Sequence, residues 1–140
     1  MNNLFSNDTI VALSTPQGIG AIGVLRLSGQ KAISITQKIW SGVNLEQANS
    51  HTLHFGTIKD EEDILDETVT GIFRAPYSFT CEDVVEISCH GSPYILQKVL
   101  QLLISKGARL ANSRMCRRRP RHYPICKAGW ERMGRSWCGA

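Results

Sequence analysis

A glycine-rich segment near the start of the chain, residues 15–29, contains Gly-Ile-Gly-Ala-Ile-Gly and matches the spacing G-x-G-x-x-G. In a dinucleotide-binding domain the last glycine of this pattern opens a helix, and the helix N-terminus binds the pyrophosphate. Here Gly23 is followed by Val-Leu-Arg-Leu, which alternates as a strand does. We therefore expect a loop between two strands and not a doubly wound nucleotide-binding domain.

Apolar periodicity and turn residues predict the remaining elements. A first helix is expected over residues 31–40, with Ser28 as a candidate N-cap. A second follows Ser92 as N-cap and Pro93 as first helical residue, and ends at Gly107. Its predicted buried stripe is Ile95, Val99, Leu102 and Leu103. Strands are expected over residues 9–14, 21–27, 51–58, 68–74, 83–89 and 108–111.

The predicted element order, ββαβββαβ, lacks a regular βαβ repeat and indicates an α+β domain with a small mixed sheet and two main helices. Two charged side chains need partners in this sheet. Arg26 lies in the strand that leaves the glycine loop, and Glu86 alternates with apolar residues of a later strand. They could pair with each other. Alternatively, Arg26 could meet a ligand carboxylate or phosphate, and Glu86 could accept two N–H bonds from a planar heterocycle.

Other arrangements of reactive residues are less promising. We expect no acid near His90 to orient its imidazole towards Ser92, so a hydrolase triad is not predicted. His51 and His54 should point to opposite faces of one strand, which makes them poor joint metal ligands.

The charge distribution divides the chain near residue 112. Residues 1–112 hold eight Lys/Arg and eleven Asp/Glu, whereas residues 113–140 hold eight Lys/Arg and one acid. No apolar run is long enough to span a membrane, and the N-terminus lacks the pattern of a signal peptide. We therefore expect a cytoplasmic protein, in which the five cysteines are free thiols.

Several short motifs, in this order and spacing, resemble the N-terminal domain of the bacterial tRNA-modification GTPase family MnmE, also called TrmE. These motifs occupy residues 8–12, 15–29, 65–67, 77–93 and 107–111. The resemblance covers residues 8–112 and defines a TrmE N-terminal-like domain over residues 1–112.

The resemblance implies a fold similar to the folate-binding aminomethyltransferase-like domains, and a homodimer formed through this domain. It also implies a tetrahydrofolate derivative, 5-formyl- or 5,10-methylene-tetrahydrofolate, bound near the dimer interface. The family's folate contacts carry over onto Arg26 and Glu86, with Glu86 holding the N–H groups of the pterin ring. The full-length family works with a flavoprotein partner on the wobble uridine of tRNA, and uses GTP, potassium and magnesium.

The chain departs from the family in two places. Cys81 stands where the family has glycine, so the turn is strained if that position needs a positive φ. After residue 112 the family pattern stops, and no G-x-x-x-x-G-K-[ST] occurs anywhere, so we expect no GTP hydrolysis from this chain.

Residues 113–140 are interpreted as an aberrant, out-of-frame or disordered extension. A nucleic-acid-binding arm is an alternative, because Tyr123 and Trp130 are interleaved with arginines 114, 117, 118, 119 and 121. A zinc site formed by Cys116, His122, Cys126 and Cys138 is less favoured, because no C-x-x-C is present. A further alternative for the domain is a dimerising interaction module that binds no folate.

Overall fold

The computed structural model describes residues 8–111. In chain order the elements are β1 Ile10–Leu13, β2 Ile22–Ser28, α1 Ala32–Ile39, β3 Trp40–Ser41, the 3-10 helix η1 Leu45–Gln47, β4 Thr52–Asp60, β5 Asp63–Phe73, β6 Val84–His90, α2 Pro93–Ser105 and β7 Arg109–Leu110. The predicted α+β domain is confirmed, with β3 and η1 as additions that the sequence patterns did not indicate.

The strands of this region form one mixed sheet in the order β3-β4-β5-β6-β2-β1-β7. Neighbouring strands are antiparallel, except that β7 runs parallel to β1 at one edge. The acidic segment at residues 60–63 makes the tight turn between β4 and β5, with Glu61 at a φ of 55°. This order places β6 and β2, which hold Glu86 and Arg26, side by side in the middle of the sheet.

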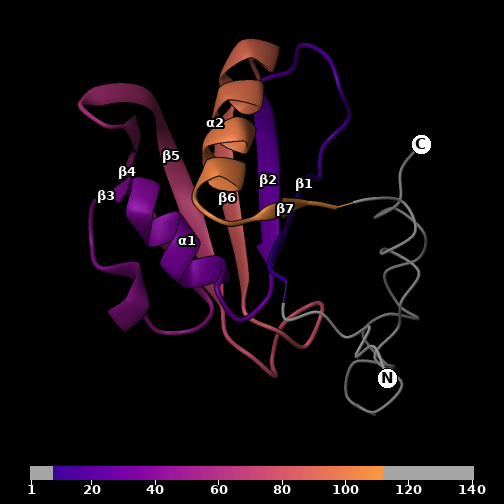
Figure 1. Ribbon diagram of the computed structural model, residues 1–140, viewed down its shortest axis with the longest axis vertical. Helices are drawn as coiled ribbons and strands as arrows, with labels where there is room; N and C mark the ends of the chain where they lie inside the picture. Colours follow the sequence, from indigo (N-terminus) through magenta and orange to yellow (C-terminus); the bar gives the residue numbers. More distant parts are fainter. Residues whose placement is uncertain (1–7, 112–140) are drawn as a thin grey trace.

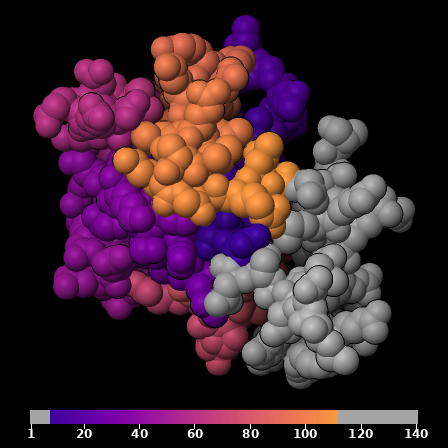
Figure 2. Space-filling view, viewed as in Figure 1, coloured from indigo at the N-terminus to yellow at the C-terminus, as the bar shows by residue number. Residues whose placement is uncertain are grey.

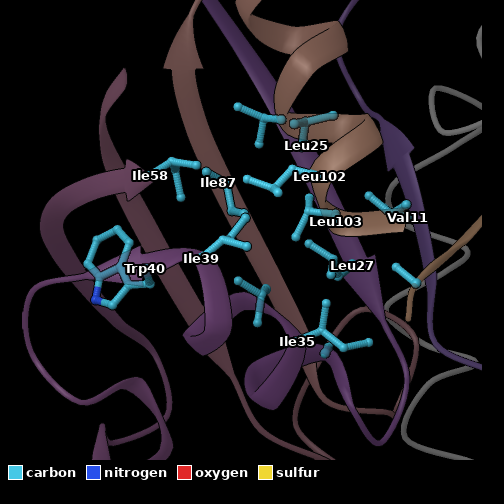
Figure 3. Close-up of a cluster of buried hydrophobic side chains, with 14 of the residues drawn as sticks. Val11, Leu25, Leu27, Ile35, Ile39, Trp40, Ile58, Ile87, Leu102 and Leu103 are labelled. Carbon is cyan, nitrogen blue, oxygen red and sulfur yellow. The ribbon is translucent and has the colours of Figure 1, made fainter. Parts of the chain in front are cut away.

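Both helices lie on the same side of the sheet (Figure 1), and Figure 2 shows the molecule from this helix-covered side. The core is the layer of apolar side chains between helices and strands. Figure 3 labels ten of its members: Val11, Leu25, Leu27, Ile35, Ile39, Trp40, Ile58, Ile87, Leu102 and Leu103. The opposite face of the sheet carries no helix of the described region, and we call it the open face.

The buried stripe of α2 differs from the predicted one at a single position. Leu96, at 6% exposure, is in the core, whereas Ile95 is half-buried at its margin. The reason lies on β2, where a Cβ added to Gly23 would come within 2.4 Å of a Leu96 methyl carbon. The last glycine of the G-x-G-x-x-G spacing therefore makes room for a helix side chain.

The two predicted N-caps also need correction. Ser28 is the last residue of β2, and its hydroxyl bonds Thr80 and Glu82, so Lys31 occupies the N-cap position of α1 instead. Ser92 does occupy the N-cap position of α2, followed by Pro93 as predicted, but its side chain makes no capping hydrogen bond. Gly107 ends the helix with a φ of 119°, which explains the glycine there.

Candidate ligand-binding site

The glycine loop joins two antiparallel strands, β1 and β2, as the sequence predicts. Its backbone pairs with the turn after β6: the Gly20 N–H donates to the Gly91 carbonyl at 3.1 Å, and the Gly91 N–H donates to the Ala21 carbonyl at 3.1 Å. A Cβ on Gly91 would lie 2.1 Å from the Gly20 carbonyl oxygen. The glycines therefore allow two turns to pack backbone against backbone, and the helix required to bind a pyrophosphate is absent after Gly23.

Arg26 and Glu86 face each other across the β2–β6 ladder. Arg26 Nη2 lies 2.5 Å from Glu86 Oε1, and the two side chains are 17% and 31% exposed. The guanidinium carbon also lies 5.7 Å from the centroid of the Phe79 ring, within the range of a cation–π contact. The structure thus brings together the two side chains for which the sequence demanded partners.

Strand alternation places this ion pair on the open face, because the odd-numbered neighbours Leu25, Leu27, Val85 and Ile87 are the ones buried under the helices. Among the residues described, Arg26 is the ion-pair partner of the Glu86 carboxylate, which is 31% exposed. A planar heterocycle with two adjacent N–H donors fits a carboxylate of this kind.

Apolar side chains surround the ion pair on the open face. Leu53 and Phe55 of β4 are 72% and 68% exposed, Ile22 of β2 is 63% exposed, and Val69 of β5 is 39% exposed. By strand register, Val69 lies opposite Ser88, and Leu53 lies opposite Gly71, which in turn lies opposite Glu86. Several exposed apolar side chains on one face of a sheet indicate a binding face.

The loop between β5 and β6 borders the site and contains the predicted strain. Cys81 has a φ of 65°, the left-handed conformation that glycine adopts without cost and other residues adopt at about 1 kcal/mol or more. The loop is nevertheless fixed: Asp83 Oδ1 accepts the Ala75 N–H, and Ser28 bonds both Thr80 and Glu82. The substitution for glycine therefore falls where a positive φ is needed. Cys81 is also disulfide-bonded, so the expectation of free thiols is wrong for this cysteine.

A pocket of about 340 Å³ lies beside this loop and not at the ion pair. Its lining includes the carboxylate residues Asp8, Glu82 and Asp83 but neither Arg26 nor Glu86. Asp8 is bonded to Arg109 at 2.9 Å, and Asp83 holds the Ala75 N–H. Glu82 Oε2 accepts the Ser28 hydroxyl at 2.9 Å, so all three carboxylates of the pocket have protein partners, and we place the candidate site at the ion pair instead.

A second polar pair was missed by the sequence reasoning, which expected no acid beside His90. Asp66 of β5 holds the imidazole: Oδ1 lies 2.6 Å from His90 Nδ1, and Oδ2 accepts the His90 backbone N–H at 2.8 Å. The His90 side chain is 70% exposed, whereas that of Asp66 is 6% exposed. Asp66 lies in one of the quoted motifs, yet the pair forms only in the folded chain, where the Asp66 carboxylate reaches the end of β6.

The thiol of Cys89, which lies next to this pair, has low reactivity. Burial, followed by the nearby Asp66 carboxylate, raises the pKa of the thiol from 9.0 to about 12. A thiol with such a pKa carries almost no thiolate near neutral pH and is a poor nucleophile or metal ligand.

In the described part of the chain, no three His, Cys, Asp or Glu side chains are grouped as metal ligands. His51 and His54 serve structural contacts, since His51 meets Phe73 edge-on and His54 bonds Thr52. The alternative zinc ligands and the basic arm fall in residues 113–140, outside the described residues. Within residues 8–111, no helix has the length and apolar character needed to cross a membrane.

Comparisons with known proteins agree with the resemblance. A family profile described as "GTP-binding protein TrmE N-terminus" matches residues 9–113. Proteins named "tRNA modification GTPase MnmE" from Cytophaga hutchinsonii and Streptococcus thermophilus are 59% and 52% identical over 104 residues, which is 74% of this chain. A protein of the same name from Flavobacterium johnsoniae is 46% identical over 113 residues, or 79% of the chain. The aligned parts make up only 23–24% of these relatives.

Proposed function

The chain belongs to the TrmE N-terminal domain family, and from this membership we propose that it is the folate-binding and dimerisation domain of a tRNA-modification GTPase. Its own role is to bind a one-carbon carrier, 5-formyl- or 5,10-methylene-tetrahydrofolate. A bound folate would supply the one-carbon unit, and the side chains described here bind and orient it. The whole protein's tRNA substrate, flavoprotein partner, GTP, potassium and magnesium belong to the same proposal, and so does the cytoplasmic location expected from the sequence.

The observation that supports folate binding is the half-exposed Glu86 carboxylate beside Arg26 on an apolar sheet face. Two carboxylate oxygens can accept two N–H donors from the pterin ring, and the ion pair with the Arg26 guanidinium holds the carboxylate in position. The apolar surroundings reduce competition from water for these hydrogen bonds.

Calorimetric titration of the full chain with 5-formyltetrahydrofolate tests this proposal. We expect binding by the wild type and a loss of at least about tenfold in affinity for Glu86→Ala, the size expected for hydrogen bonds to a charged group. Glu62→Ala, which removes an exposed carboxylate from the β4–β5 turn, is the matched control and should bind as the wild type does. Absence of binding by the wild type, or equal binding by Glu86→Ala, overturns the proposal.

Homodimerisation is the second part of the proposal, and the exposed side chains of the open face support it. A second copy of the chain would cover Leu53, Phe55 and Ile22, whose exposure in a single copy leaves a large apolar area in water. A two-fold dimer uses the same face on both copies, so one apolar face suffices. If sedimentation shows a dimer while calorimetry shows no ligand binding, the chain is an interaction module instead.

A further inference from the structure

The open face holds a second polar residue, His90, which takes no part in the proposed pterin contact. On β6, alternation places Glu86, Ser88 and His90 in one row, about 13 Å from first to last at about 3.3 Å per residue. Glu86 stands at one end of this row. At the other end stands His90, an imidazole that is exposed yet held by a buried carboxylate.

The Asp66 contacts fix how the imidazole is presented. Its carboxylate accepts the Glu67 backbone N–H at 2.9 Å, the His90 backbone N–H at 2.8 Å and the imidazole Nδ1–H at 2.6 Å. With Nδ1 bound in this way, Nε2 is the ring atom that faces outward. When protonated, the imidazole donates Nδ1–H to Asp66 and offers Nε2–H to an external acceptor.

Between Glu86 and His90, apolar residues of the two neighbouring strands flank the row on both sides. Ser88 lies between Val24 of β2 and Val69 of β5 in the strand register. Val69 is 39% exposed and Val24 is half-buried. A flat hydrophobic group lying along β6 would contact both valines on its way from Glu86 to His90.

From this row we propose that His90, positioned by Asp66, binds the carboxylate end of a ligand whose heterocycle is held by Glu86. The inference rests on the proposed folate function and extends it. The ligand class is a heterocycle joined through an aromatic ring to an acidic tail. Glu86 binds the donor-rich end, the two valines contact the ring between, and His90 binds a tail carboxylate through Nε2–H.

The test compares ligands with and without the acidic tail. Calorimetry on the full chain uses 5-formyltetrahydrofolate and the neutral primary amide of 5-formyltetrahydropteroic acid, which lacks the glutamate and carries no carboxylate. The wild type should bind the glutamate-bearing ligand about fivefold more tightly, as expected of one exposed ionic contact. His90→Asn keeps a donor for Asp66 near the position of Nδ1 but removes Nε2. It should bind both ligands equally, with unchanged affinity for the neutral amide.

The same exchange on β4, His54→Asn, is the control and should keep the fivefold preference. Thermal melting by circular dichroism is measured for each variant, because a purely structural role for His90 would lower the melting temperature without changing the ratio of the two affinities. A fivefold preference that persists in His90→Asn, or its absence in the wild type, overturns the inference while the Glu86 proposal stands. Failure of the wild type to bind either ligand overturns both.

Discussion

Among the glycines that the structure describes, Gly91 leaves the least room for a Cβ, which would lie 2.1 Å from the Gly20 carbonyl oxygen. It packs its backbone against Gly20, and a Cβ there would meet backbone atoms rather than a flexible side chain. Gly20 itself is different, because a Cβ on it would find its nearest neighbour at 3.8 Å. An added Cβ would therefore clash at Gly91 but would have room at Gly20, although the two glycines are in contact.

We expect Gly91→Ala to lower the free energy of unfolding by about 2 kcal/mol or more, the range typical of overpacking. Gly20→Ala should change it by less than about 0.5 kcal/mol. Urea denaturation of both variants measures the difference. Similar stabilities for the two would show that the turns can separate at little cost.

The buried thiol of Cys89 makes stability depend on alkaline pH. Its pKa is raised from 9.0 to about 12 by burial and by Asp66. Below pH 9.0 both states hold the proton and the stabilising contribution is fully present. Between the two pKa values the unfolded chain loses its proton first, so this contribution falls as pH rises, by up to about 1.4 kcal/mol per pH unit.

Cys89→Ala removes the pH-dependent contribution of the thiol. The free energy of unfolding of this variant should therefore decline less steeply above pH 9.0 than that of the wild type. Urea denaturation with reductant at a series of alkaline pH values measures both slopes. Parallel curves for the two proteins would mean that the thiol does not titrate differently in the folded state.

At the scale of elements, α2 shows how a small residue on a neighbouring strand selects the buried face of a helix. Leu96 enters the space left by Gly23, whereas Ile95 stays at the margin of the core. We expect Leu96→Ala to cost about 2–4 kcal/mol and Ile95→Ala markedly less. Chemical denaturation distinguishes them, and equal losses would favour the stripe predicted from helical periodicity alone.

The elements predicted correctly are those whose local pattern agrees with their packing. The runs that became β1, β2 and β6, and the helix after Pro93, have clear periodicity and clear ends. The first half of β5 is polar, and β3 and η1 are too short to show periodicity, so they depend on tertiary pairing. A charged residue within an apolar strand marked Arg26 and Glu86 as site candidates. No local sequence pattern indicates that Asp66 contacts His90, because the two residues meet only in the folded chain.

At the scale of the whole molecule, the sheet has one covered and one open face. Phe55→Asp places a charge on the open face, where the proposed dimer would bury it, and should convert a dimer to a monomer. Tyr94→Asp is the matched control: it has the same 68% exposure but belongs to α2 on the covered side. Sedimentation velocity reads the outcome, and a dimer that survives Phe55→Asp would place the contact elsewhere.

The pairing of β7 with β1 also has a consequence for how the domain is made. The Arg109 N–H donates to the Thr9 carbonyl, the Ala111 N–H donates to the Val11 carbonyl, and Arg109 bonds Asp8 at 2.9 Å. During synthesis, the outer hydrogen-bonding edge of β1 leaves the ribosome before its partners in β7, since Asp8 and Arg109 are 101 residues apart in the chain. Until then the nascent chain exposes an open strand edge, the feature that invites aggregation.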